Sequence, residues 1–64
     1  EIERYQEAID DCNKVIQINP DFAEAYWGLA ISKYYLGLDG CPDLKMAKAL
    51  GSGFPPEAIE QICN

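Results

Sequence analysis

The sequence predicts an all-α fold of about four helices. Its apolar residues recur at three- and four-residue spacing, which places them on one face of a helix. Proline and glycine residues divide the 64-residue chain into helix-sized segments, because both residue types interrupt helices or follow their ends. No segment shows the two-residue alternation that is typical of a β-strand.

The first segment, residues 2–18, is predicted to be an amphipathic helix. Pro20 ends it, because the residue before a proline is pushed out of the helical region. Asp21 is expected to cap a second helix from residue 23 to about residue 36, with Glu24 as the acid of a capping box. Gly37 fits the left-handed position after that helix. The apolar positions of the first segment are Ile2, Tyr5, Ala8, Ile9, Cys12, Val15 and Ile16.

The second helix carries two apolar stripes. A helix at a protein surface needs only one, so the second stripe indicates either burial on both sides or a binding surface. One stripe contains Tyr26, Leu29 and Ala30, and the other contains Trp27, Ile31 and Tyr34.

Two shorter helices are predicted to follow. Residues 39–42 form a turn, with Pro42 as the first residue of a helix that runs to about residue 50. Residues 51–53, Gly-Ser-Gly, interrupt it. A fourth helix begins at Pro55–Pro56 and runs to about residue 63. Its expected apolar positions are Phe54, Ala58, Ile59 and Ile62.

Composition argues against several classes of function. Eleven acids against five bases give a formal net charge of −6, which disfavours nucleic acid and anionic membrane surfaces as partners. No apolar run approaches the roughly 18 residues of a membrane span. Histidine is absent, and neither serine has a base partner in the sequence, so we expect no catalysis, no metal site and no cofactor. No feature indicates a compartment, and the cytoplasm is the default expectation.

Cys12, Cys41 and Cys63 are the three cysteines of the chain. Their odd number and wide spacing are unlike a disulfide framework, and buried free thiols are the favoured interpretation. A disulfide between Cys41 and Cys63 is the alternative, since both residues lie near the ends of predicted helices.

Residues 5–37 resemble the tetratricopeptide repeat. Ala8 matches the small residue where the two helices of that repeat touch, and Pro20 matches its closing proline. Gly37 matches the glycine that ends the first helix of a repeat. The large–large–small signature of that first helix is matched by Tyr26, Leu29 and Ala30. The resemblance implies helical hairpins stacked as a right-handed superhelix.

The rest of the chain departs from the repeat pattern, most clearly where Gly51 replaces the closing proline. The resemblance implies that residues 1–18 are the second helix of one repeat, 21–50 one degenerate repeat, and 55–63 a capping helix. The chain opens with the character of a helix interior, so we expect a piece of a longer array whose upstream repeats cover exposed apolar surface.

Such repeats bind extended or helical peptides in the groove formed by their first helices. The resemblance implies a protein-binding scaffold without catalysis. Its ligand is expected to be an apolar or basic protein or peptide segment, not an acidic tail. Self-association into a homo-oligomer is the structural alternative, and the non-catalytic tail of a larger enzyme is a third. The implied groove positions are Glu24, Trp27, Ile31 and Tyr34, with Tyr35, Asp21 and Phe22 at the margin.

Overall fold

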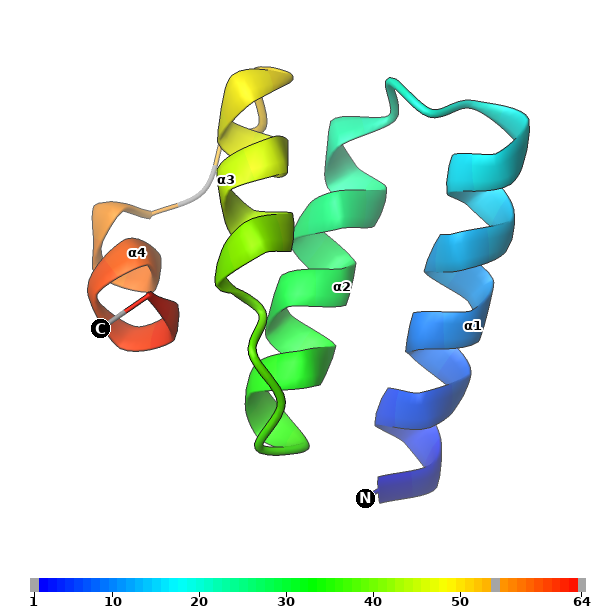
Figure 1. The fold of residues 1–64 in the computed structure, drawn as a ribbon, viewed down its shortest axis with the longest axis horizontal. Helices are drawn as coiled ribbons and strands as arrows, with labels where there is room; N and C mark the ends of the chain where they lie inside the picture. The colour runs from blue at the N-terminus through cyan, green and yellow to red at the C-terminus, as the bar shows by residue number, and fades with distance from the viewer. Residues whose placement is uncertain (1, 54, 64) are drawn as a thin grey trace.

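The computed structural model describes residues 2–53 and 55–63 and contains no strand within those ranges, which confirms the predicted all-α class. Helices α1, α2 and α3 lie side by side and alternate in direction, and α4 lies on the outer side of α3 (Figure 1). The resulting layer is thin, with extents of 27 × 26 × 15 Å. The helices are α1 (Ile2–Ile18), α2 (Ala23–Tyr35), α3 (Cys41–Ala49) and α4 (Pro56–Ile62).

The turn between α1 and α2 corrects one prediction. Helix α1 ends before Asn19–Pro20, as predicted, but Asp21 does not cap α2. The helix begins at Ala23, so Phe22 occupies the N-cap position, and no side chain caps it. Asp21 stands one residue too early, and its own N–H donates to Asn19 Oδ1 at 3.3 Å. The prediction of a capping box between Asp21 and Glu24 is therefore wrong.

Two glycines end α2 and α3 in the same way. Gly37 has φ of 77° and Gly51 has φ of 89°, a left-handed conformation that glycine adopts without steric cost. After α2, the N–H of Leu38 donates to the carbonyl of Lys33 at 2.7 Å. After α3, the N–H of Ser52 donates to the carbonyl of Ala47 at 2.9 Å. These Schellman-type closures satisfy carbonyls that each helix end would otherwise leave unpaired, and they confirm the predicted role of Gly37.

The starts of the last two helices differ slightly from prediction. Helix α3 begins at Cys41, so Pro42 is its second residue and not its first. Asp39 Oδ1 accepts a hydrogen bond from the N–H of Cys41 at 3.1 Å, which supplies a partner for that free N–H. Helix α4 begins at Pro56, close to the predicted start. Phe54, an expected apolar position, lies outside the described residues.

The core is built largely from small side chains. Small residues allow helix backbones to approach closely, and Gly40 shows how closely they do so. A Cβ atom added at Gly40 would collide with the carbonyl oxygen of Ala30 and lie 3.0 Å from its Cα. Leu44 is the largest fully buried side chain described, with 1% exposed. The buried apolar residues are Ile9, Ala25, Leu29, Ala30, Leu44, Ala47 and Ala58.

Polar and aromatic contacts join neighbouring helices at their margins. Between α1 and α2, the rings of Tyr5 and Tyr35 stack with centroids 5.0 Å apart. Between α2 and α3, Lys33 Nζ lies 2.7 Å from Asp43 Oδ2. Both residues of this ion pair are partly exposed, so it contributes little to stability, about 0.5 kcal/mol. The hairpins are therefore held mainly by close apolar packing.

The favoured interpretation of the cysteines is wrong for two of them. Cys41 and Cys63 form a disulfide, with Cα atoms 4.7 Å apart and a sequence separation of 22. Cys12 is the free cysteine among the described residues. Sequence spacing could not decide this, because the fold brings the start of α3 and the end of α4 together.

Candidate functional site

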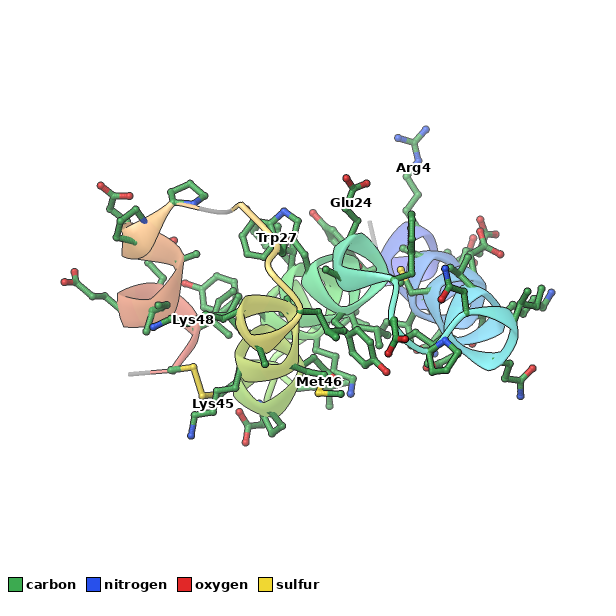
Figure 2. The ribbon with its side chains drawn as sticks, turned by 90° about the horizontal axis from the view of Figure 1, so that it is seen from above. Arg4, Glu24, Trp27, Lys45, Met46 and Lys48 are labelled. Atoms are coloured by element: carbon green, nitrogen blue, oxygen red, sulfur yellow. A yellow bond between two sulfur atoms is a disulfide. The ribbon has the colours of Figure 1, made fainter. Side chains whose placement is uncertain are left out.

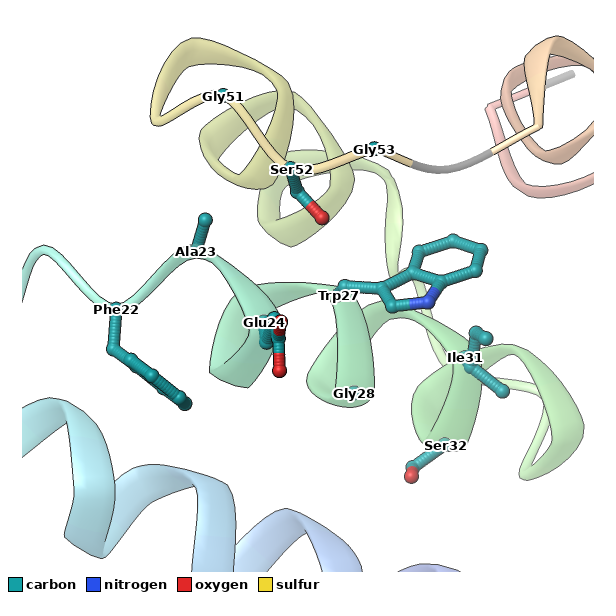
Figure 3. Close-up of a pocket in the computed structure, with 10 residues that line it drawn as sticks. All are labelled: Phe22, Ala23, Glu24, Trp27, Gly28, Ile31, Ser32, Gly51, Ser52 and Gly53. Atoms are coloured by element: carbon teal, nitrogen blue, oxygen red, sulfur yellow. The ribbon is translucent and has the colours of Figure 1, made fainter.

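A groove lies between α2, from its start to Ser32, and the segment that follows α3. Its volume is about 700 Å³. Figure 3 shows Trp27 and Ile31 on the side of α2 that faces the segment leading to α4, and Phe22 directed towards α1. The described residues that line the groove are Phe22, Ala23, Glu24, Trp27, Gly28, Ile31, Ser32, Gly51, Ser52 and Gly53.

The antiparallel α2–α3 hairpin positions both walls. Glu24, Trp27 and Ile31 are three and four residues apart, so one face of α2 presents them together. Because α3 runs opposite to α2, its C-terminal end lies beside the start of α2. The left-handed Gly51 turns the chain there, and the small residues Ser52 and Gly53 form the second wall. The backbone closure of α3 thus places this wall of the groove.

The groove combines apolar walls with one acid. Trp27 and Ile31 are half-buried, whereas Phe22 is 42% exposed. Glu24 is exposed and is the one charged residue among the described lining residues. A groove that combines apolar side chains, polar groups and a carboxylate suits a ligand that has apolar groups and a positive charge.

The described residues offer little for catalysis. They contain no cluster of three or more histidine, cysteine, aspartate or glutamate side chains that could hold a metal ion. Burial raises the pKa of the Cys12 thiol, and the nearby Asp11 carboxylate raises it further. This thiol is therefore a weak nucleophile at neutral pH. A Cβ at Gly28 would lie 2.9 Å from Cys12 Sγ, so the thiol packs closely against α2.

Comparison with known proteins identifies the family. The family model described as TPR repeat matches residues 1–37, which is more than half of the chain and spans α1 and α2. The chain belongs to the tetratricopeptide repeat family. No curated protein and no solved structure matches it.

Family membership supports a general function. Tetratricopeptide repeats are scaffolds for protein–protein interaction and are typically non-catalytic, so the chain's partners are proteins. None of the helices in the part of the chain that the structure describes is long and apolar enough to cross a membrane.

The structure separates the groove residues expected from the tetratricopeptide resemblance into two sets. Glu24, Trp27 and Ile31 line the groove, and so does Phe22, which was placed at the margin. Tyr34 does not line it, although it shares the helical stripe of Trp27 and Ile31. The lining of the groove on α2 ends at Ser32, before Tyr34.

The two remaining expected residues make contacts elsewhere. Tyr35 stacks on Tyr5 of α1 and meets Tyr34 edge-on, with ring centroids 5.5 Å apart. Asp21 takes part in the turn between α1 and α2 through its bond to Asn19. Both side chains therefore lie outside the groove.

The second wall of the groove was missed by sequence reasoning. Gly51, Ser52 and Gly53 were interpreted only as a helix-breaking segment. A signal was present, because an antiparallel hairpin brings the end of its second helix beside the start of its first. The predicted hairpin could therefore have placed residues 51–53 next to Glu24 and Trp27.

Proposed function

We propose that the groove binds a segment of a partner protein that carries apolar and basic side chains. The observation that supports this most directly is that Trp27 and Ile31 line a groove of about 700 Å³ together with Glu24. Large aromatic side chains make strong anchors at protein interfaces because they bury much area and lose little rotamer freedom.

Charge supports the basic character of the partner segment. Glu24 is the charged lining residue, and the whole chain carries a formal net charge of −6. A positively charged segment would be attracted during approach, whereas an acidic tail would be repelled. The groove also has no lysine or arginine among its described lining residues to grip a carboxylate.

We also propose a division of the chain into repeat units. Residues 1–18 would form the second helix of one repeat, 21–50 a degenerate repeat, and 55–63 a cap. The family match over residues 1–37 and the position of α4 on the outer side of α3 support this division (Figure 1).

The groove can be tested with peptides selected from a random displayed library on the immobilised full chain. We expect selected sequences rich in apolar residues and in Lys or Arg. Fluorescence polarisation of a labelled selected peptide should show at least about tenfold weaker binding to Trp27→Ala, as for an interface anchor. Glu24→Gln should weaken binding less, and should reduce its dependence on salt.

Tyr34→Ala is the matched control, because Tyr34 is an aromatic residue of the same helix outside the groove. It should bind the peptide within about twofold of the unmodified chain, since a peripheral side chain contributes little. Equal binding by Trp27→Ala and the unmodified chain would overturn the proposal. So would a loss of about 10 °C or more in the melting temperature of Trp27→Ala, a shift that marks a core residue.

Self-association is the second candidate function, and the exposed apolar side chains outside the groove support it. Several large apolar side chains are exposed outside the groove, with Ile18 exposed by 86% and Leu38 by 55%. Apolar surface of this kind often marks an interface. Size-exclusion chromatography with light scattering separates the candidates. A tight dimer in which Trp27 fluorescence resists quenching by added iodide would favour self-association over an open groove.

A further inference from the structure

The last helix is attached to the rest of the molecule differently from the other three. Helix α4 has seven residues, and Ala58 is the one residue of α4 that is buried. Ile59 and Ile62 are half-buried, and the remaining residues of the helix are exposed. A helix of two turns is not stable alone in water and depends on tertiary contacts. Packing of this extent leaves α4 with weak non-covalent attachment.

The Cys41–Cys63 disulfide supplies the missing attachment. It joins the first residue of α3 to the residue that follows α4. In Figure 2 the bond appears in yellow at the edge of the molecule, near Lys45. Both cysteines are half-buried, so the bond lies at the margin of the packed core. A bond at this margin is more accessible to a reducing thiol than one in the middle of the core would be.

The surface beneath α4 also shows imperfect packing. A cavity of about 180 Å³ lies between α3 and α4. Leu44 of α3 and Ile59 of α4 line it, together with Lys45, Lys48 and Cys63. Space of this kind means lost dispersion contacts, so α4 gains less from covering Leu44 than a fully packed helix would.

We propose that the Cys41–Cys63 disulfide is a redox switch that controls whether α4 stays docked on α3. A dithiol reductant, either a small molecule or a protein, would open it by thiol–disulfide exchange. One reductant thiolate attacks a cysteine sulfur, forms a mixed disulfide and releases the other cysteine as a thiolate. The second reductant thiol then displaces the first cysteine. The reductant is oxidised to a disulfide, and Cys41 and Cys63 each end as a thiol.

Opening the bond would change two surfaces. Release of α4 uncovers Leu44, which is 1% exposed in the oxidised protein. It also frees the segment 51–53, which lies inside the loop that the disulfide closes and forms one wall of the groove. The release of α4 itself does not depend on the proposed ligand of that groove.

Hydrogen exchange followed by mass spectrometry tests the switch on the full chain, oxidised and then reduced with dithiothreitol. Reduction should make peptides covering residues 55–63 exchange at least about tenfold faster, because local opening governs their protection. The N–H groups of Ala58 and Cys63, which donate to Pro55 and Ile59, should report it. Peptides from α1 and α2 should keep their protection.

Two variants and a thiol count complete the experiment. Cys63→Ser under oxidising conditions should exchange like the reduced chain, and Cys12→Ser should respond to reduction like the unmodified chain. Denatured oxidised protein should titrate one thiol, and reduced protein three. Unchanged protection of residues 55–63 after full reduction would overturn the proposal. Three thiols in the oxidised protein would also overturn it. So would an equal loss of protection in all four helices, because the disulfide would then stabilise the whole fold and not α4 alone.

Discussion

The α2–α3 hairpin and the α4 segment meet at α3, whose buried Leu44 also lines the cavity beside α4, yet the two regions are held by different interactions. In the hairpin, Gly40 allows the chain to contact the backbone at Ala30 directly, and several alanines let the helices approach. At α4, one buried alanine, Ala58, and one disulfide attach a two-turn helix. Many short contacts stabilise the hairpin, whereas α4 has one buried and two half-buried apolar residues and a covalent bond.

Under the proposed switch, the attachment of α4 depends on a single pair of cysteines. Inside the hairpin, loss of one contact leaves many others in place. At α4, loss of the disulfide removes the constraint on the loop between Cys41 and Cys63, which is about 3 kcal/mol by the chain-entropy estimate. Substitutions in the hairpin should therefore lower the stability of the whole molecule, whereas substitutions in α4 should mainly affect α4 itself, and by less.

The largest effect is expected for Leu44→Ala. It removes the largest fully buried side chain described and should lower the free energy of unfolding by about 3 kcal/mol. In a chain of this length that corresponds to roughly 15 °C in melting temperature, measured by circular dichroism. Met46→Ala is the control on the same helix, because Met46 is 43% exposed. Equal losses in the two variants would contradict the assignment of Leu44 to the core.

A smaller effect is expected for Gly40→Ala. The added methyl group would collide with the backbone at Ala30, so α2 and the start of α3 must separate, at about 2 kcal/mol. Gly53→Ala is the matched control, because a Cβ there meets no atom within 4 Å. It should change the free energy of unfolding by less than about 0.5 kcal/mol. Urea denaturation measures the free energy of unfolding of both variants. If the two were equally stable, close packing at Gly40 would not be what stabilises the hairpin.

The smallest effect is expected for Ile59→Ala in α4. Ile59 is half-buried, so its truncation should cost about 1 kcal/mol. The loss should appear as faster hydrogen exchange in residues 55–63, with α1 and α2 unchanged. Gln61→Ala, at an exposed position of the same helix, serves as the control. If Ile59→Ala lowered the protection of every helix, α4 would belong to the same cooperative unit as the hairpin, and the contrast between the two regions would fail.

Local sequence predicted the helices well. The helix ends near Pro20, Gly37 and Gly51 follow from the backbone preferences of proline and glycine. These preferences act within a few residues, so the sequence predicts them directly. Asp21 shows where this reading fails. A cap depends on the residue at which the helix begins, and a shift of one residue made Phe22 the N-cap in its place.

The groove was predicted only in part. Helical spacing placed Glu24, Trp27 and Ile31 together, because periodicity is a local property. The same spacing included Tyr34, which does not line the groove, and omitted Ser52 and its neighbours, which form its second wall. Which end of a helical stripe meets another segment depends on how the helices are arranged, and helical periodicity alone does not carry that information.

The sequence by itself determined the helical class, the positions of the breaks and the resemblance to tetratricopeptide repeats, since these depend on spacing, prolines and glycines. Only the tertiary structure decided that Cys41 bonds Cys63, and that α2 faces residues 51–53 across a groove. Both depend on segments distant in sequence meeting in space, which local spacing does not determine.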